Sequence, residues 1–280
     1  MSSRDSTPIV KKAYRTIKNM LLTVVASIVV IYLLLCMLLY LTQERLIFFP
    51  EVLAPDFEYN FPHHFEEITW QVDGATINAL HFKADNPRGA ILYFRGNAGS
   101  LRSWGAIAAD FIRHGYDVLI PDYRGYGKST SKITNEHMLH QDALFAYTYL
   151  QQHYPENQII VYGRSLGTGL AVRLAVSKKP RMLILETPYF SLRDIARRQF
   201  PFIPGILLKY PLRTDLWISD VSCPIYLFHG TRDEFIPYNS SVRLLPLIKT
   251  EHELFTIQGG GHNNLGDFAQ YHENLERILR

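Results

Sequence analysis

Residues 158–176, QIIVYGRSLGTGLAVRLAV, constrain the fold more than any other stretch of this 280-residue chain. The apolar run before Gly163 is typical of a buried strand, and the run after Gly167 has the period of a helix. Ser165 lies between the two glycines, where a sharp strand-to-helix turn forces strained backbone angles. Glycine on both sides removes the Cβ atoms that would clash. The pattern therefore predicts a serine whose Oγ is exposed at the tip of a tight turn.

The helix after this turn would point its positive N-terminal end at Ser165, which favours a developing oxyanion there. The pentapeptide G-x-S-x-G is common by chance, and the flanking strand and helix are what make it specific. A tight strand-to-helix turn without chemistry is the alternative interpretation.

Short apolar runs alternate with helical patterns through the rest of the globular part. Strands are expected near residues 66–72, 75–83, 89–96, 116–122, 158–163, 181–187, 224–230 and 252–258. Helices are expected near Ser100–His114, Glu136–His153, Ser165–Val176, Ser240–Ile248 and Leu265–Leu279. The alternation predicts an α/β fold, a mostly parallel sheet with helices on both faces. Asp73–Gly74 predicts an antiparallel hairpin that leads into this sheet.

Two loops after later strands carry residues that complement Ser165. Asp233 lies just past a buried strand in LFHGTRDEFIP, and His262 lies in a glycine-rich loop in FTIQGGGHNNL. His262 would take the proton from the Ser165 hydroxyl, and Asp233 would orient the imidazole and stabilise its charged form. Glu186, at the end of another strand, is the alternative acid.

The segments YFRGNAGS, PDYRGYGKS, YGRSLGTG, HGTRDEFIP and GGGHNN together resemble those of the α/β-hydrolase superfamily. The resemblance covers about Phe65 to Arg280. With the apolar N-terminal segment and the RLIFFP after it, the chain is similar to a membrane-anchored branch of serine hydrolases, some of which are protein depalmitoylases. The resemblance implies an α/β-hydrolase fold and a Ser165–Asp233–His262 triad that cleaves an ester or thioester without a cofactor or a metal. An amidase or peptidase with the same triad, and a non-enzymatic membrane scaffold on this fold, are the alternatives.

The family also implies an oxyanion hole made by backbone N–H groups. FRGNAG occupies the position of the family's usual His-Gly-Asn, which assigns one amide to Asn97 and the other to Leu166. Arg95 replaces the family's histidine. We expect Arg95 to place a cation near the mouth of the site, where it would favour an anionic group.

Residues 188–222 interrupt the alternation with several prolines and aromatic residues. They predict a small cap inserted between two strand–helix units. Phe190, Phe202 and Trp217 are candidates to line a pocket above Ser165 and to select apolar acyl groups. Covering the sheet's own core is the alternative role for part of this apolar surface.

Residues Met20–Leu41 contain no charge and are long enough to span the ~30 Å hydrocarbon core of a bilayer. The expected organisation is a cytoplasmic tail over 1–18, a transmembrane anchor over 19–41, a turn-rich linker over 42–64 and the hydrolase domain over 65–280. A cleaved signal peptide is less consistent with this run, because no small residues follow it.

The flanks of the apolar run predict its orientation. Arg4, Lys11, Lys12, Arg15 and Lys18 precede it, whereas only Arg45 follows closely. The positive-inside rule then places the N-terminus in the cytoplasm and the catalytic domain on the extracytoplasmic side. Phe48 and Phe49 either sit at the membrane interface or pack onto the domain.

Composition excludes some other classes of function. The formal net charge is +3, and no basic run interleaves with aromatic residues, so nucleic acid is not an expected partner. His137 and His140 fit the polar face of a helix better than a metal site, because no further ligand motif accompanies them. The expected partners are a lipid bilayer and an ester, thioester, acyl-lipid or acyl-protein substrate.

Overall fold

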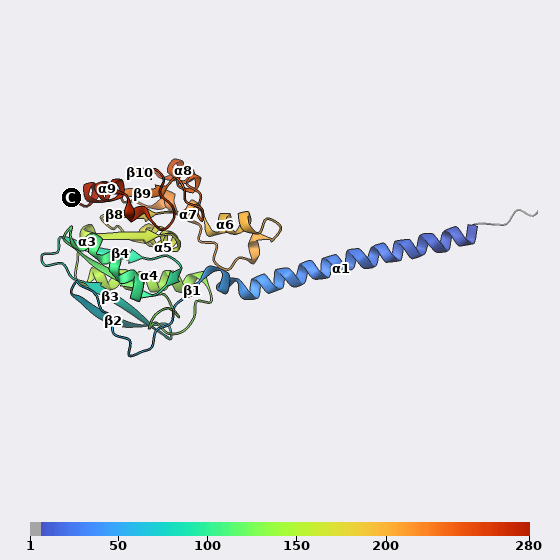
Figure 1. Ribbon diagram of the computed structural model, residues 1–280, viewed down its shortest axis with the longest axis horizontal. Coiled ribbons are helices and arrows are strands. Elements are labelled where there is room, and N and C mark those ends of the chain that lie inside the picture. The colour runs from blue at the N-terminus through green and yellow to red at the C-terminus, as the bar shows by residue number, and fades with distance from the viewer. Residues whose placement is uncertain (1–6) are drawn as a thin grey trace, which may run out of the picture. The chain divides into compact units, whose positions relative to one another are not determined.

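The structure, a computed structural model, describes residues 7–280 (Figure 1). The beginning of the expected cytoplasmic tail, with Arg4, lies outside the described residues. The chain divides into two compact units, with the boundary between Gln43 and Glu44.

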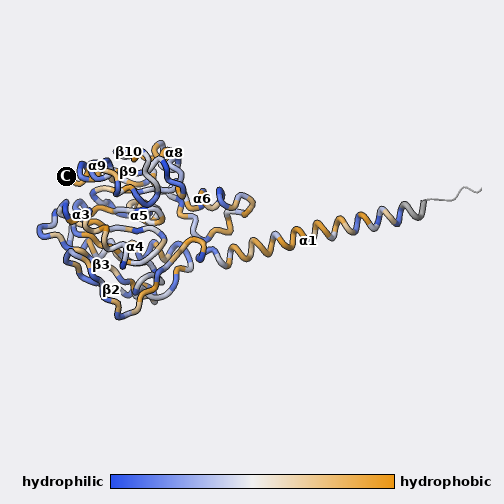
Figure 2. The backbone as a smooth tube through the Cα atoms, viewed as in Figure 1, coloured by the Kyte–Doolittle hydropathy of each residue, from blue (hydrophilic) through white to orange (hydrophobic). Residues whose placement is uncertain are grey.

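Helix α1 (Thr7–Ile47) contains the uncharged run. Figure 2 shows hydrophobic residues along most of its length. The segment Lys11–Ile47 is long and apolar enough to cross a membrane. Large apolar side chains between Met20 and Leu41 are mostly exposed.

An eight-stranded sheet forms the centre of the second unit. Its strands are β2 (Phe65–Val72), β3 (Ala75–Phe82), β4 (Gly89–Phe94), β6 (Tyr116–Pro121), β7 (Ile159–Arg164), β8 (Met182–Glu186), β9 (Ile225–Gly230) and β10 (His252–Ile257). They lie in the order β10-β9-β8-β7-β4-β6-β3-β2. The pairings from β10 to β6 are parallel, and β3 pairs antiparallel with both β6 and β2. The predicted mostly parallel sheet is confirmed.

The turn between β2 and β3 has the predicted hairpin chemistry. Asp73 has φ 42° and Gly74 has φ 74°. Two successive residues with positive φ match the right-handed twist of the strands, which is why Asp-Gly is favoured there.

Helices cover both faces of the sheet. They are α2 (Leu101–Trp104), α3 (Ala109–Ile112), α4 (Glu136–Gln151), α5 (Leu166–Ser177), α8 (Asn239–Leu244) and α9 (Ala269–Leu279). Leu139 of α4 and Leu170 of α5 belong to one apolar core. Phe111 of α3 and Leu275 of α9 belong to the other. Strands β4 and β6 are buried along their whole length, which explains their continuous apolar sequences.

The segment between β8 and β9 contains two short helices, α6 (Leu192–Gln199) and α7 (Thr214–Trp217). The Ser191 side chain accepts a hydrogen bond from the Asp194 amide at 3.0 Å and so caps the start of α6. Prolines follow α6 and prevent its continuation. The sequence predicted an insertion here and did not predict these helices.

Part of the expected linker, residues 42–64, packs on the domain. The compact hydrolase unit begins at Glu44. Strand β1 (Phe49–Pro50) pairs with β5 (Ala98–Gly99), and Phe48 is buried against Tyr210. The turn-rich composition did not reveal these contacts, and α1 extends to Ile47, beyond the expected end of the anchor at residue 41. Phe48 therefore packs onto the domain, whereas Phe49 is half exposed.

Candidate active site

Ser165 occupies the predicted turn between β7 and α5. Its backbone has φ 50° and ψ −116°, a conformation that is strained for a residue with a side chain. Because α5 begins at Leu166, its first amides have no partner within the helix and point toward the turn.

Two close approaches explain the glycines on either side. A Cβ at Gly163 would lie 2.6 Å from the carbonyl oxygen of Gly167. One at Gly167 would collide with the carbonyl oxygen of Phe94 on β4. Strand β7, helix α5 and strand β4 can therefore approach this closely only with glycine at both positions.

Three side chains that are far apart in sequence meet at this turn. The Nε2 atom of His262 lies 2.9 Å from Ser165 Oγ, and its Nδ1 atom lies 2.8 Å from Asp233 Oδ2. Asp233 comes from the loop after β9, and His262 comes from the loop after β10. Both loops leave the carboxyl edge of the sheet, the same edge at which β7 delivers Ser165.

The environment of Asp233 keeps it ionised. Burial opposes the charge, but hydrogen bonds from His229 and His262 and from the backbone amide of Ile236 outweigh it and lower the pKa of Asp233. Its Oδ1 atom accepts from the amides of Phe235 at 3.0 Å and Ile236 at 2.8 Å. Asp233 can therefore hold the proton on His262 Nδ1 and leave Nε2 free to accept one from Ser165.

His229 is a neighbour of Asp233 that the sequence analysis missed as a site residue. It is fully buried, and its Nε2 atom lies 3.3 Å from Asp233 Oδ2 and 2.9 Å from the carbonyl oxygen of Ile236. Its Nδ1 atom lies 2.7 Å from Ser241 Oγ. The only available signal was its place at the end of a strand, four residues before Asp233.

Glu186, the alternative acid, faces a different partner. It is buried, accepts a hydrogen bond from Tyr162 Oη at 2.6 Å and pairs with Arg164 Nε at 3.2 Å. The structure brings Asp233 rather than Glu186 against His262.

The loop expected to supply an oxyanion amide lies beside Ser165. A Cβ at Gly96 would be 3.8 Å from the Cβ of Ser165. The carbonyl of Asn97 accepts from the Phe49 amide at 3.0 Å and from Tyr126 Oη at 2.8 Å. Asn97 is therefore held from both sides next to Ser165, and its role in an oxyanion hole with Leu166 stays a prediction.

The expectation that Arg95 lies at the mouth is wrong. Its side chain is fully buried, and its Nε and Nη2 atoms lie 3.0 and 2.6 Å from Asp122 Oδ1. The guanidinium also lies over the rings of Tyr123 and Tyr126, at 4.7 and 4.5 Å from their centroids. The carboxylate and the rings draw Arg95 inward, so its charge is neutralised inside the domain.

The cap aromatics do not form the predicted pocket. Phe202 is 85% exposed. Arg243 lies 3.7 Å from the ring centroid of Phe190, and Trp217 packs against His140 and under Arg173. Phe190 and Trp217 also contact the main core, so they have the structural role that was the alternative.

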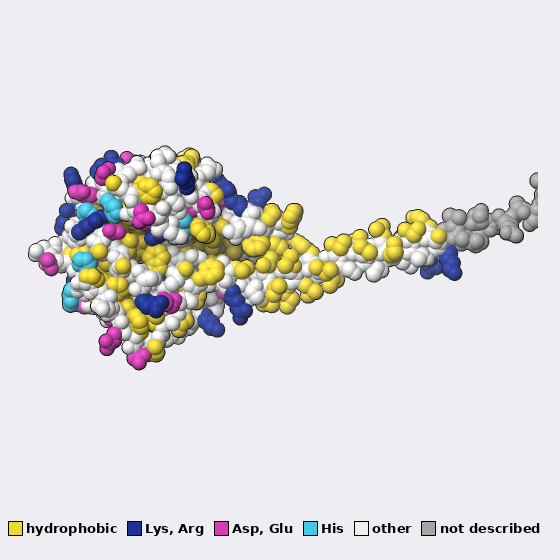
Figure 3. Space-filling view, in the orientation of Figure 1, with side chains coloured by type: hydrophobic (Ala, Val, Ile, Leu, Met, Phe, Trp, Pro, Cys, Tyr) yellow, Lys and Arg dark blue, Asp and Glu magenta, His cyan; other side chains and the backbone are white. Residues whose placement is uncertain are grey.

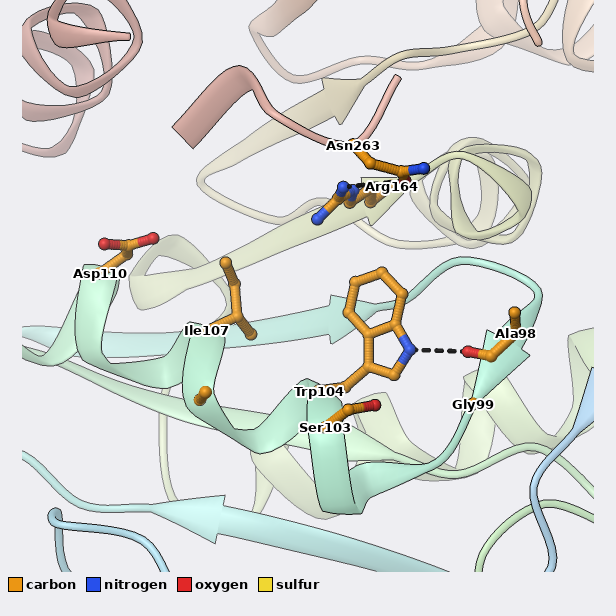
Figure 4. A pocket seen from close by; sticks show the side chains of 9 residues that line it. Ala98, Gly99, Ser103, Trp104, Ile107, Asp110, Arg164 and Asn263 are labelled. Carbon is orange, nitrogen blue, oxygen red and sulfur yellow. Dashed lines mark hydrogen bonds between the residues drawn. The ribbon is translucent and has the colours of Figure 1, made fainter. Parts of the chain in front are cut away.

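A pocket of about 580 Å³ lies between Arg164 and the α2–α3 region (Figure 4). Its lining residues are Ala98, Gly99, Ser103, Trp104, Ala106, Ile107, Asp110, Arg164 and Asn263. Trp104 donates to the Ala98 carbonyl at 2.8 Å, and Arg164 lies 5.1 Å from the centre of its ring. The Nη2 atom of Arg164 lies 3.4 Å from the carbonyl oxygen of His262, so this pocket adjoins the Ser165 turn.

Comparison with known proteins identifies the family of this chain. Residues 85–213 match the family described as serine aminopeptidase, S33. Alpha/beta hydrolase domain-containing protein 17B of Homo sapiens is 30% identical over 201 residues, which cover 69% of this chain and 67% of that protein. Protein bem46 of Schizosaccharomyces pombe is 30% identical over 212 residues, which cover 71% of this chain and 70% of that protein. The chain belongs to the α/β-hydrolase family.

Solved structures show the same fold for this hydrolase. A Pyrococcus furiosus esterase, Pf2001, superposes with a TM-score of 0.68 at 16% sequence identity, covering 83% of this chain and 97% of that one. The family and the fold predicted from the sequence are thus confirmed, and the chain is a hydrolase.

Proposed function

We propose that this hydrolase is a membrane-anchored serine esterase or thioesterase. The observation that carries the proposal is the chain of hydrogen bonds from Ser165 through His262 to Asp233, with both distances below 3 Å. Ser165 is the nucleophile, His262 the general base and Asp233 the orienting carboxylate.

The reaction proceeds in two halves. Ser165 Oγ attacks the acyl carbon while His262 Nε2 takes its proton, and the amides of Leu166 and Asn97 stabilise the oxyanion. The intermediate collapses as His262 returns the proton to the leaving alcohol or thiol. Water then attacks the acyl-enzyme with His262 again as base, which releases the carboxylic acid and restores Ser165.

The pocket next to Ser165 supports an apolar acyl group. Trp104 and Ile107 give it an apolar wall, while Asp110 and Asn263 lie at its polar side. Arg164 is paired with Glu186, so its charge is partly compensated before any substrate binds. Each buried methylene of an acyl chain contributes about 0.8 kcal/mol, which favours longer chains up to the length the pocket holds.

The anchor in this proposal is α1. The uncharged run within it is sufficient to cross a bilayer, and the basic residues before the run favour a cytoplasmic N-terminus. The catalytic unit then lies on the extracytoplasmic side, close to acylated lipids or proteins in the membrane.

A peptidase with the same three residues is the second candidate, because the matched family is described as a serine aminopeptidase. Its chemistry differs only in the leaving group, an amine in place of an alcohol or thiol. Turnover of p-nitrophenyl esters, acyl thioesters and aminoacyl p-nitroanilides by the same detergent-solubilised preparation separates the two candidates.

The decisive experiment uses the Ser165→Ala variant. A fluorophosphonate probe should label the wild-type chain at Ser165. The Ser165→Ala variant should not be labelled, and its kcat should be lower by a factor of about 10⁶. Ser219→Ala, a surface serine outside the site, should keep both. Labelling that survives Ser165→Ala would contradict the assignment, and an ester profile that peaks at acetate would contradict the apolar acyl group.

A further inference from the structure

The cap carries an apolar segment in which several large side chains are exposed. Between α6 and α7, residues 200–208 have the sequence FPFIPGILL. Phe202 is 85% exposed and Ile206 is 88% exposed, and Phe200 is also exposed. Figure 2 shows hydrophobic colour on the tube beyond α6. Exposed apolar segments of this kind mark an interaction surface on a folded protein.

Basic residues border the segment. Arg193, Arg197 and Arg198 on α6 are exposed, and Lys209 follows the segment directly. Figure 3 shows basic side chains over this part of the molecule. Asp194 is the acidic residue of α6, and it already bonds Arg243 and Arg198 at 2.9 and 3.1 Å. In an anionic bilayer, charged headgroups cover the acyl chains. An apolar tip flanked by cations is complementary to this surface, because the tip can enter the acyl chains while the cations contact the headgroups.

The C-terminal end of this segment is held against the first residues of the hydrolase unit by contacts within that unit. Lys209 Nζ lies 2.9 Å from Glu44 Oε1, and Tyr210 Oη donates to the same oxygen at 3.1 Å. The Tyr210 ring packs edge-on against Phe48. Glu44 follows the last residue of the uncharged run, Leu41, by three positions. The base of the segment therefore lies where the chain would leave the bilayer.

We propose that residues 200–208 form a second membrane attachment, with Phe202 and Ile206 inserted among the acyl chains of an anionic bilayer and the α6 arginines at its headgroups. This inference rests on the anchoring by α1 proposed above. An anchored domain with one tether rotates freely, whereas a second contact fixes which side of it faces the lipid. Because the tether makes the second contact intramolecular, a weak interaction is sufficient.

The test places a tryptophan at the tip. Full-length Phe202→Trp chain is reconstituted into phosphatidylcholine vesicles, with or without phosphatidylglycerol, whose acyl chains are brominated to quench nearby tryptophan. The wild-type signal of Trp70, Trp104 and Trp217 is subtracted. Glu273→Trp is the matched control, because Glu273 is exposed on α9, at the opposite end of the hydrolase unit from α6 in Figure 1.

The expected result is a blue-shifted emission and a loss of intensity for Phe202→Trp in phosphatidylglycerol vesicles, and neither change for Glu273→Trp. Adding Arg197→Glu and Arg198→Glu to Phe202→Trp should reduce the quenching in anionic vesicles and leave it unchanged in phosphatidylcholine. Equal emission from Phe202→Trp and Glu273→Trp would overturn the inference, and would point to a protein partner or to no partner for this segment.

Two further measurements on the same vesicles separate this inference from the proposed function. Resistance to carbonate extraction reports the anchor, and probe labelling at Ser165 reports a folded site. A chain that resists extraction but shows no quenching refutes the second attachment alone. A chain washed out by carbonate refutes the anchor and the inference together. If Phe202→Trp is quenched but the probe does not label the wild-type chain, the second attachment is supported and the proposed serine hydrolase activity is refuted.

Discussion

Asp233 is a buried carboxylate between two histidines, and replacing it should lower the rate of the reaction. Asp233→Asn keeps the shape of the side chain but permits the wrong tautomer of His262, and we expect kcat to fall by about 10⁴. Glu186→Gln should cost far less, because Glu186 bonds Tyr162 and Arg164 and does not contact His262. The measurement is kcat on one p-nitrophenyl ester.

The two variants control for each other, since both replace a buried, hydrogen-bonded carboxylate by its amide. Far-UV circular dichroism of the purified chains checks that each variant is folded. The reverse ranking of the two rates would assign the acid to Glu186.

The lowered pKa of Asp233 also predicts a pH dependence of stability. The ordinary value is 3.8, and the folded value lies below it, so the unfolded chain takes up this proton first as the pH falls. The ionised Asp233 contributes fully to the free energy of unfolding above pH 3.8, and this contribution is lost as the pH falls through the pKa that Asp233 has in the folded chain. Between about pH 4 and about pH 2 the free energy of unfolding should therefore fall more steeply for wild type than for Asp233→Asn.

Denaturant titration in detergent at a series of pH values measures this difference. Glu273→Gln, an exposed carboxylate on α9, should show the wild-type slope. Equal slopes for wild type and Asp233→Asn would mean that Asp233 is not preferentially ionised in the folded state.

The sequence could locate Ser165, Asp233 and His262 because each follows a strand that its own neighbours in sequence reveal. The environment of Arg95 could not be predicted in this way. Its partners Asp122, Tyr123 and Tyr126 follow β6, a strand whose position beside β4 is a property of the sheet order. The exposure of Phe202 was equally hidden, because an apolar residue in a cap can face either the core or the outside.

At the scale of elements, the buried pair of Arg95 and Asp122 fastens the loop between β4 and α2. Arg95 Nη1 donates to the Gly96 carbonyl at 3.1 Å, and Asp122 Oδ2 accepts from the Leu101 amide at 3.2 Å. Arg95→Leu leaves Asp122 buried without its partner, which should cost about 3–5 kcal/mol of stability. Because the loop carries Asn97, kcat should fall as well.

A double-mutant cycle tests whether the pair acts together. Adding Asp122→Asn to Arg95→Leu removes the unpaired charge, and the double variant should be more stable than the sum of the two single losses predicts. Urea denaturation of the four proteins gives the coupling. Additive losses would show that Arg95 and Asp122 contribute independently.

The elements predicted correctly are those whose own apolar residues show the pattern of a strand or a helix. The strands of the main sheet and α4, α5 and α9 carry apolar runs or helical spacing that local sequence reveals. Strand β1 has two residues and no period, and its pairing with β5 depends on a contact about fifty positions away. Helix α6 has only eight residues, and its apolar face rests on Leu192 and Ile195, which pack against the core. So short a stripe in a segment rich in prolines is a weak helix signal.

At the scale of the whole molecule, the proposed catalytic residues and the proposed membrane-binding segment follow strands at the same edge of the sheet. Ser165, Asp233 and His262 all follow the carboxyl ends of strands, and the segment that carries α6 follows the carboxyl end of β8. A second membrane contact by residues 200–208 would therefore belong to the same edge as Ser165. Such an arrangement suits a substrate whose acyl chain is delivered from a bilayer.

Anchoring by α1, as proposed above, would also set the side of the membrane on which the reaction occurs. Lys11, Lys12, Arg15 and Lys18 precede the uncharged run, and the first turn beyond it offers only Arg45, next to Glu44. Holding the basic cluster in the cytoplasm leaves the hydrolase unit outside.

In sealed inside-out vesicles the unit should consequently be protected from added protease, and in intact right-side-out vesicles it should be degraded. Replacing the four basic residues with glutamine and adding lysines at Thr42 and Gln43 should reverse this pattern in part of the population, because the charge difference sets the orientation. Detergent-opened vesicles, in which the unit is exposed from both sides, give the reference for full digestion. Protection in right-side-out vesicles together with digestion in inside-out ones would place the site in the cytoplasm and contradict the orientation proposed here.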